Sequence, residues 1–228
     1  MLQPSYTTPH RAHYNQLLAE LRNNLLGLGQ AVEQSFARAI ESLYERDTAK
    51  ACEVIAYDLY IDAAHRALET DVIRLLATQQ PIVGADLRLL MVAAAVATEL
   101  ERIGDYACGI ARCICRKPDQ LPQFVLPANL MQVVALMQQM LTTSLQALAK
   151  QDTVLAQSLV QIHSELDTLR QALRLQLMAL ARANVQYLEV ILEVLHIIRH
   201  LERVAHRATN IGERVIYLVT SKVEGMSS

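Results

Sequence analysis

Apolar residues recur at steps of three and four positions along most of the chain, which is the spacing of amphipathic helices. Polar or Pro-containing segments interrupt this pattern and divide it into six stretches. We predict helices over about residues 17–46, 48–79, 86–116, 128–150, 154–183 and 187–221. Asp47 stands just before the second stretch, and we predict that it is the N-cap of that helix. An Asp side chain at this position accepts hydrogen bonds from free amides of the first turn.

The second half of the chain repeats the first. A segment that begins Leu-Glu-Arg at Leu100 recurs in a degenerate copy at Leu201, an offset of 101 residues, and Asp47 recurs as Asp152 at an offset of 105 residues. Long helices joined by short loops pack as antiparallel neighbours. We therefore predict an all-α fold of two tandem three-helix bundles that are related by pseudo-twofold symmetry.

The breaks in the pattern also predict the domain boundaries. We expect the first three-helix repeat over residues 10–117 and the second over residues 128–222, joined by a Pro-rich linker at 118–127. Residues 1–9 and 223–228 are predicted to be flexible ends.

The third and sixth predicted helices each carry a continuous apolar seam whose positions alternate in steps of three and four, as in a coiled coil. Gly104 and Gly109 lie inside the third helix, where each costs about 1 kcal/mol relative to Ala. We predict that another helix or a ligand packs closely against both glycines.

Composition and charge argue against several classes of protein. Apolar residues make up 52% of the chain, which argues against disorder, and the formal net charge of −2 argues against nucleic-acid binding as the main task. The longest apolar run, Leu89 to Ala97, is too short to span a bilayer, and the first residues carry no signal-peptide pattern. Four cysteines are too few for a disulfide scaffold and suit a reducing cytoplasm. We therefore expect this protein to act by binding another protein.

A polar pair interrupts an apolar stripe at the same helical level in both halves. The pair is Glu101 and Asp105 in the first copy, and Glu202 and His206 in the second. Residues four apart share one face of a helix, so the two acids of the first copy repel each other and a cation would relieve that repulsion. Iron, manganese, zinc and magnesium suit such ligands about equally. The alternative interpretation is that these residues form surface ion pairs with neighbouring arginines.

A metal ion needs more ligands than one pair supplies, and the neighbouring helix of each half offers them. The candidates are Asp58, Asp62, His163 and Asp167.

The repeated segments resemble those of the PhoU-type phosphate-uptake regulators. The resemblance rests on Leu-Glu-Arg-Ile-Gly-Asp-Tyr-Ala from Leu100, on Leu-Glu-Arg-Val-Ala-His-Arg-Ala-Thr-Asn-Ile-Gly-Glu from Leu201, on Gln-Gln-Pro at 79–81 and on Glu-Arg-Asp at 45–47. It covers nearly the whole chain, from about residue 13 to residue 220. Two tandem copies at this spacing are hard to obtain by chance.

The resemblance implies a bacterial, cytoplasmic accessory protein that is not an enzyme and that represses phosphate uptake and the phosphate-starvation response. Such proteins are thought to couple the ATPase subunit of a phosphate transporter to a phosphate-sensing histidine kinase. We expect these two partners, a homodimer, and membrane association only through partners. The family fold is two three-helix bundles, and some members bind multinuclear iron or zinc.

Carried over by motif, the resemblance implies metal ligands in both copies. Glu101 and Asp105 match the family pattern in the first, and Glu202, Asn210 and Glu213 match it in the second. The chain departs from the pattern in other places. His206 replaces an Asp, and Gly109 and Arg112 replace Asn and Glu, so the resemblance implies that the two sites differ in occupancy or metal preference.

Two other classes of function remain open. Carboxylate-bridged di-iron oxidases use Glu-x-x-His pairs inside helical bundles, and Glu193 with His196 and Asp62 with His65 have that spacing. Neither pair has a counterpart in the other half. We interpret His65, His196 and His200 as solvated or capping residues. The last class is a structural helical adaptor that binds no ligand.

Overall fold

The computed structural model describes residues 9–78, 82, 84–116, 124–222 and 225. Six long α-helices and one short 3-10 helix account for nearly all of them. Their bounds are α1 Pro9–Glu45, α2 Thr48–Thr78, α3 Gly84–Arg116, α4 Ala128–Lys150, α5 Thr153–Ala183, η2 Val185–Tyr187 and α6 Leu188–Thr220. All six predicted helices are present, and most of their ends lie within two residues of the prediction.

The first helix begins earlier than its apolar pattern predicts. α1 starts at Pro9, so it includes several of the polar residues that precede Leu17. Tyr14 is only 2% exposed and belongs to the core, and Arg11 donates a 2.8 Å hydrogen bond to Asp86 at the start of α3. These two contacts hold an extra stretch of helix against the bundle.

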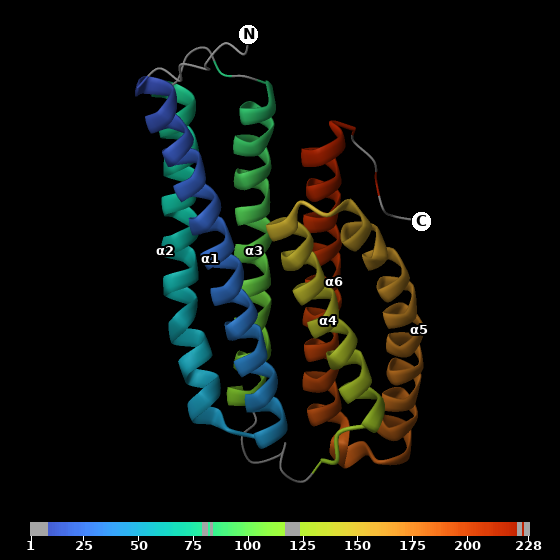
Figure 1. Ribbon diagram of the computed structural model, residues 1–228. Helices are drawn as coiled ribbons and strands as arrows, with labels where there is room; N and C mark the ends of the chain where they lie inside the picture. Colours follow the sequence, from blue (N-terminus) through green and yellow to red (C-terminus); the bar gives the residue numbers. More distant parts are fainter. Residues whose placement is uncertain (1–8, 79–81, 83, 117–123, 223–224, 226–228) are drawn as a thin grey trace.

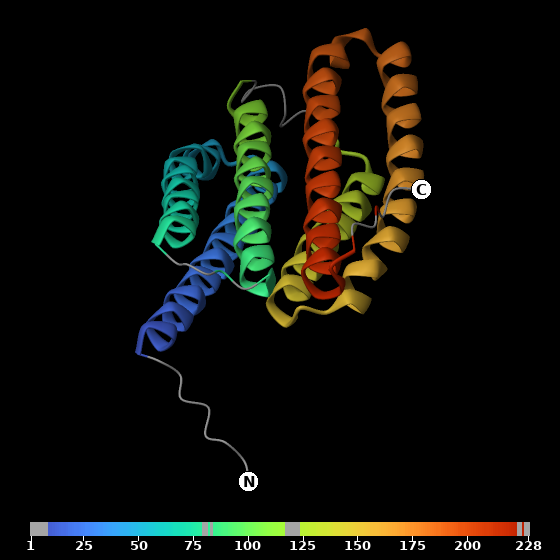
Figure 2. The ribbon, with the colours of Figure 1, turned by 90° about the horizontal axis from the view of Figure 1, so that it is seen from above.

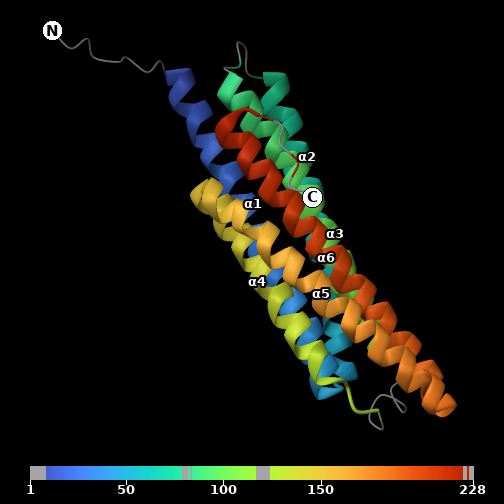
Figure 3. The same ribbon diagram turned by 90° about the vertical axis from the view of Figure 1, so that its right-hand side faces the viewer.

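The helices form two bundles that stand side by side, α1 to α3 in one and α4 to α6 in the other (Figure 1). Seen from the side, the helices of both bundles follow one common direction (Figure 3). The predicted fold class of two tandem, pseudo-symmetric three-helix bundles is therefore confirmed. The predicted flexible ends and linker fall mostly outside the described residues, which include only 9, 225 and 124–127 of those ranges.

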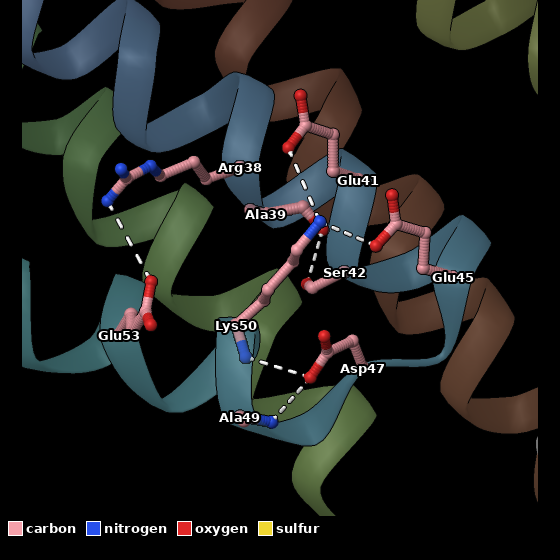
Figure 4. Close-up of polar contacts among 9 residues, drawn as sticks. All are labelled: Arg38, Ala39, Glu41, Ser42, Glu45, Asp47, Ala49, Lys50 and Glu53. Atoms are coloured by element: carbon pink, nitrogen blue, oxygen red, sulfur yellow. Dashed lines mark hydrogen bonds and ion pairs between the residues drawn. The ribbon is translucent and has the colours of Figure 1, made fainter.

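The first connection of each bundle is built in the same way. Arg46 and Gln151, at an offset of 105 residues, both adopt the left-handed conformation, with φ of 58° and 52°. The next residue caps the following helix: Asp47 Oδ1 accepts from the amides of residues 49 and 50 at 2.9 and 3.0 Å (Figure 4), and Asp152 Oδ1 accepts from Val154 and Leu155. The predicted N-cap is confirmed, and the repeat is accurate to the residue at this point.

The two bundles meet along α3 and α6, which lie next to each other at the centre of the molecule (Figure 2). The helices run antiparallel, because Glu99 in the middle of α3 contacts Arg207 just past the middle of α6, whereas Arg116 at the end of α3 contacts Glu193 near the start of α6. The predicted seam residues of α3 are all buried: Val96, Leu100, Ile103, Ala107, Ile110 and Ile114. On α6 the seam is buried from Val190 to Val215.

Small residues permit the close approach of helices. A Cβ added to Gly109 would lie 2.5 Å from Cε1 of His200 on α6, and a Cβ added to Gly104 would lie 3.0 Å from Ile61 on α2. The predicted close packing at both glycines is confirmed. The interpretation of His200 as a solvated or capping residue is wrong, because its ring is held between α3 and α6 and also contacts the ring of Tyr106, with centroids 6.0 Å apart.

Replacing Gly109 by Ala should destabilise the protein although Ala is the better helix former by about 1 kcal/mol. The new methyl group must displace the His200 ring, and overpacking of this kind costs about 1–3 kcal/mol. Gly27 in α1 provides the matched control, because a Cβ there would have nothing within 4 Å. Urea unfolding should show Gly27→Ala more stable than the parent protein and Gly109→Ala less stable. Equal gains in both variants would contradict this packing.

Candidate metal centre

The predicted ligands face one another across the second and third helices of each bundle. In the first half, Asp58 of α2 lies beside the Gly104 position of α3, with its Oδ1 3.5 Å from a Cβ built there, and it is close enough to Asp105 to feel its charge. In the second half, the rings of His163 on α5 and His206 on α6 lie 5.3 Å apart between centroids. The sequence pattern therefore correctly predicted that α2 contacts α3 and that α5 contacts α6.

Four carboxylates gather in the first half. Burial, together with the nearby charges of Asp105 and Asp62, raises the pKa of Asp58 against the lowering effects of a Cys108 hydrogen bond and of Arg112. Burial also raises the pKa of Glu101, again with Asp105 and Asp62 adding to it and with Arg102 and His65 opposing it. Burial is thus the main cause of both shifts, and the mutual repulsion of the acids adds to it.

The spacing of His65 from Asp62 is that of a ligand pair, but the interpretation of His65 as a solvated or capping residue does not describe its place in the structure. Its side chain is 15% exposed, and its charge would act on Glu101 across the α2–α3 contact. Its Nε2 atom is buried and finds no hydrogen-bond partner among the described residues, although Oε1 of Glu69 lies 3.6 Å away. A buried imidazole nitrogen beside carboxylates is a suitable ligand for a transition metal.

Cys108 contributes a protonated thiol to the metal-free cluster. Burial, with the nearby Asp58 charge, raises the pKa of its thiol to about 12. The thiol therefore stays protonated at neutral pH and hydrogen-bonds Asp58.

In the second half, an arginine side chain lies between the predicted ligands. Arg170 of α5 reaches Glu202 of α6 through Nη1, and its Nη2 lies 3.0 Å from Oδ1 of Asp167. Two of the acids that were predicted to bind metal are thus already paired with a guanidinium. Sequence reasoning did not include Arg170 in the site, because its contact with Glu202 joins two helices and leaves no periodic signal.

The two histidines of the second half lie beside this ion pair. His163 Nδ1 is 3.1 Å from the Thr209 hydroxyl, and its Nε2 is 3.8 Å from Asp167. Burial lowers the pKa of His206, and the charges of His163 and Arg170 lower it further, against the opposing effect of Glu202. His206 is therefore neutral at physiological pH.

Glu213 lies on α6 seven residues after His206, about 10 Å further along the helix axis. It is the repeat counterpart of Arg112, whose charge acts on Asp58 in the first half. The two halves thus place opposite charges at this position.

As the side chains stand, no three His, Cys, Asp or Glu groups among the described residues are arranged to hold a metal ion. The predicted ligand groups nevertheless differ between the two halves. The first half has clustered acids and an unpartnered imidazole nitrogen, which fit a cation. The second half does not fit one, because Arg170 pairs with its acids, as the alternative interpretation of arginine ion pairs predicts.

The two pairs with di-iron spacing do not share a site. Glu193 is 3.7 Å from Arg116 at the end of α3, whereas Asp62 lies near Glu101. Glu101 and Arg116 are separated by about 22 Å of helix. This separation gives the oxidase interpretation no structural support.

Comparison with known proteins decides the family. The family model described as PhoU domain matches residues 25–114 and again residues 130–215. The chain belongs to the PhoU family. The two matched segments correspond to the two bundles, so each bundle is one PhoU repeat.

Relatives of similar length support the PhoU assignment. A phosphate-specific transport system accessory protein PhoU homolog of Synechocystis is 32% identical over 98% of this chain and 98% of that protein. The homolog of the same name from Clostridium acetobutylicum is 30% identical over 90% of this chain and 93% of its own. The crystal structure of PhoU from Pseudomonas aeruginosa superposes with a TM-score of 0.85 at 29% identity, covering 92% of this chain and 100% of that one.

The contrast between the halves predicts opposite effects of one substitution at two equivalent positions. In metal-free protein at pH 7, Glu101→Gln should stabilise the fold by at least the ~0.2–0.5 kcal/mol of one like-charge pair. Glu202→Gln should destabilise it by up to about 1 kcal/mol, because it removes the negative charge that pairs with Arg170.

The pH dependence follows from the raised pKa of Glu101. A carboxyl group whose folded pKa is raised favours the folded state below its unfolded pKa and loses that effect as pH rises through the folded pKa. The gain from Glu101→Gln should therefore shrink as the pH falls toward about 4. Denaturant unfolding with chelator present, between pH 4 and 8, measures both variants, and a loss of stability in Glu101→Gln at pH 7 would refute the charge imbalance.

Proposed function

We propose that this protein represses phosphate uptake and the phosphate-starvation response, as an adaptor between the ATPase subunit of a phosphate transporter and a phosphate-sensing histidine kinase. The observation that carries the proposal is the match of both repeats to the PhoU domain, together with relatives of the same length that are named phosphate-specific transport system accessory proteins. The regulatory character of the family supports a role without catalysis.

Exposed apolar side chains support a protein partner. Leu87 and Met91 on α3 are 43% and 55% exposed, and their repeat counterparts Leu188 and Leu192 on α6 are 43% and 48% exposed. Exposed apolar patches rimmed by polar residues are typical of protein interaction sites. Their recurrence in both halves, on the stripe that also carries the acids, gives the adaptor two equivalent surfaces.

The place of action follows from the same proposal. In the described residues, no helix is long and apolar enough to cross a membrane. We propose a cytoplasmic homodimer that reaches the membrane only through its partners. Exposed apolar residues on α2, Leu59 at 73% and Tyr60 at 56%, offer a further surface for self-association.

Deletion of the gene should leave starvation-type expression switched on in phosphate-rich medium, and the parent protein supplied in trans should restore repression. The double variant Met91→Glu/Leu192→Glu should fail to restore it, because two charges enter the proposed docking surfaces. Val154→Glu is the matched control, since Val154 is 72% exposed away from those surfaces. Reporter expression and circular dichroism of the purified variants measure the outcome. Normal repression in the deletion strain would refute the regulatory function.

We further propose that iron or zinc binds in the first half, with Glu101, Asp105 and His65 as ligands and Asp58 and Asp62 beside them. The metal ion would neutralise the mutual repulsion of these carboxylates. The unpartnered His65 nitrogen and the raised pKa of Glu101 support this choice.

Replacing both acids of the motif, Glu101→Gln with Asp105→Asn, should reduce metal uptake by one equivalent or more. Equilibrium dialysis of tag-free protein against Zn²⁺ or Fe²⁺, followed by elemental analysis, measures the uptake. Glu41→Gln is the control, because Glu41 lies on α1, is 58% exposed and contacts Lys50. Unchanged metal content in the double variant would rule out this site.

A further inference from the structure

His65 and Arg170 occupy equivalent positions in the two repeats. They are 105 residues apart, the same offset that relates the two helix caps Asp47 and Asp152. Each also faces the first acid of its motif helix, since His65 acts on the charge of Glu101 and Arg170 contacts Glu202. The same location therefore holds an imidazole in one half and a guanidinium in the other.

This exchange changes what the location can do. An imidazole offers a nitrogen lone pair to a metal ion, and it can lose its charge near neutral pH. A guanidinium has only donors, cannot be deprotonated in a protein, and matches the geometry of carboxylates. Arg170 is thus unable to be a ligand and is instead a permanent positive charge beside the ligands.

The contacts of Arg170 use the oxygen atoms that a metal ion would need. The guanidinium binds Glu202 through Nη1 and Asp167 through Nη2, and its side chain is only 26% exposed. By contrast, the first-half counterparts of these acids, Glu101 and Asp62, have only loose ion pairs to the exposed Arg102 and Arg66, at 3.5 and 3.9 Å.

His163, another predicted ligand of the second half, also has polar neighbours. The Thr209 hydroxyl donates to the carbonyl of Ala205 at 3.1 Å, so its oxygen accepts from His163 Nδ1. The other ring nitrogen, Nε2, lies 3.8 Å from Oδ2 of Asp167, whose Oδ1 is in contact with Arg170. A divalent ion would have to separate Asp167 from both His163 and Arg170.

We propose that Arg170 takes the place of a metal ion in the second repeat, so that its acids are neutralised by the chain itself and this half binds no divalent metal. The second half then keeps one arrangement whether or not metal is available. Only the first half responds to metal supply. This inference concerns the second half alone and holds whether or not the first half is loaded.

The test isolates the second half by working in the Glu101→Gln/Asp105→Asn background, with tag-free protein dialysed against Zn²⁺ and then against Mn²⁺. The background protein should hold no metal above the buffer. Adding Arg170→His, which copies the residue of the first half, should raise the content to one equivalent per chain. Adding Glu202→Gln to that variant should abolish the gain.

Arg170→Lys is the matched control, because it keeps the positive charge and should bind no metal. Circular dichroism confirms that each variant is folded. The proposal would be wrong if the background protein held one equivalent of metal and lost it when Glu202→Gln/His206→Ala was added. This outcome does not depend on the Arg170 variants. A folded Arg170→His variant that gains no metal would also overturn it. Metal uptake by the parent protein reports on the first half separately.

Discussion

The antiparallel contact between α3 and α6 is the constraint on which the rest of the molecule depends. Its seam residues are almost completely buried, and each large apolar side chain contributes about 1.5–3 kcal/mol when it leaves water. Exposed ion pairs contribute about 0–1 kcal/mol each. The seam therefore fixes the two motif helices, and polar residues elsewhere adapt to them.

The seam also shows how a symmetric scaffold accommodates different chemistry. Glu99 bonds to Arg207 and Asn210 on one side of the pseudo-twofold axis. The equivalent position on the other side holds His200, which packs on Gly109 and Tyr106. One position thus forms polar contacts across the two helices, and its counterpart packs a histidine ring against a glycine. Both kinds of contact fit the same antiparallel packing of α3 and α6.

The acid clusters beside the seam follow the same principle. Each motif helix presents a Glu to the neighbouring helix of its bundle, where unpaired charge is costly. In the second half Arg170 supplies the opposite charge. In the first half burial, with the repulsion of neighbouring acids added, raises the pKa of Asp58 and Glu101. The PhoU repeat thus tolerates both a cluster of acids and an arrangement in which an arginine pairs with them.

The sequence predicted the fold well because helix spacing, caps and the repeat are local or periodic signals. Asp47 and Gly109 could be interpreted from one helix at a time. The start of α1 was missed because Tyr14 joins the core from within a polar segment. The role of Arg170 was missed because its contact with Glu202 depends on how α5 is rotated against α6, which no spacing along the chain records. The spacing of His65 from Asp62 was visible, but not that the ring faces Glu101 of α3.

The central claim is that the two repeats differ in charge compensation, with a cation site in the first and a built-in guanidinium in the second. Crystals of the metal-loaded parent protein, measured at the absorption edge of zinc or iron, test it most directly. We expect anomalous density between Glu101 and Asp105 and none between Glu202 and His206, where Arg170 remains in contact with Glu202. Comparable density at both positions, with Arg170 displaced, would contradict it.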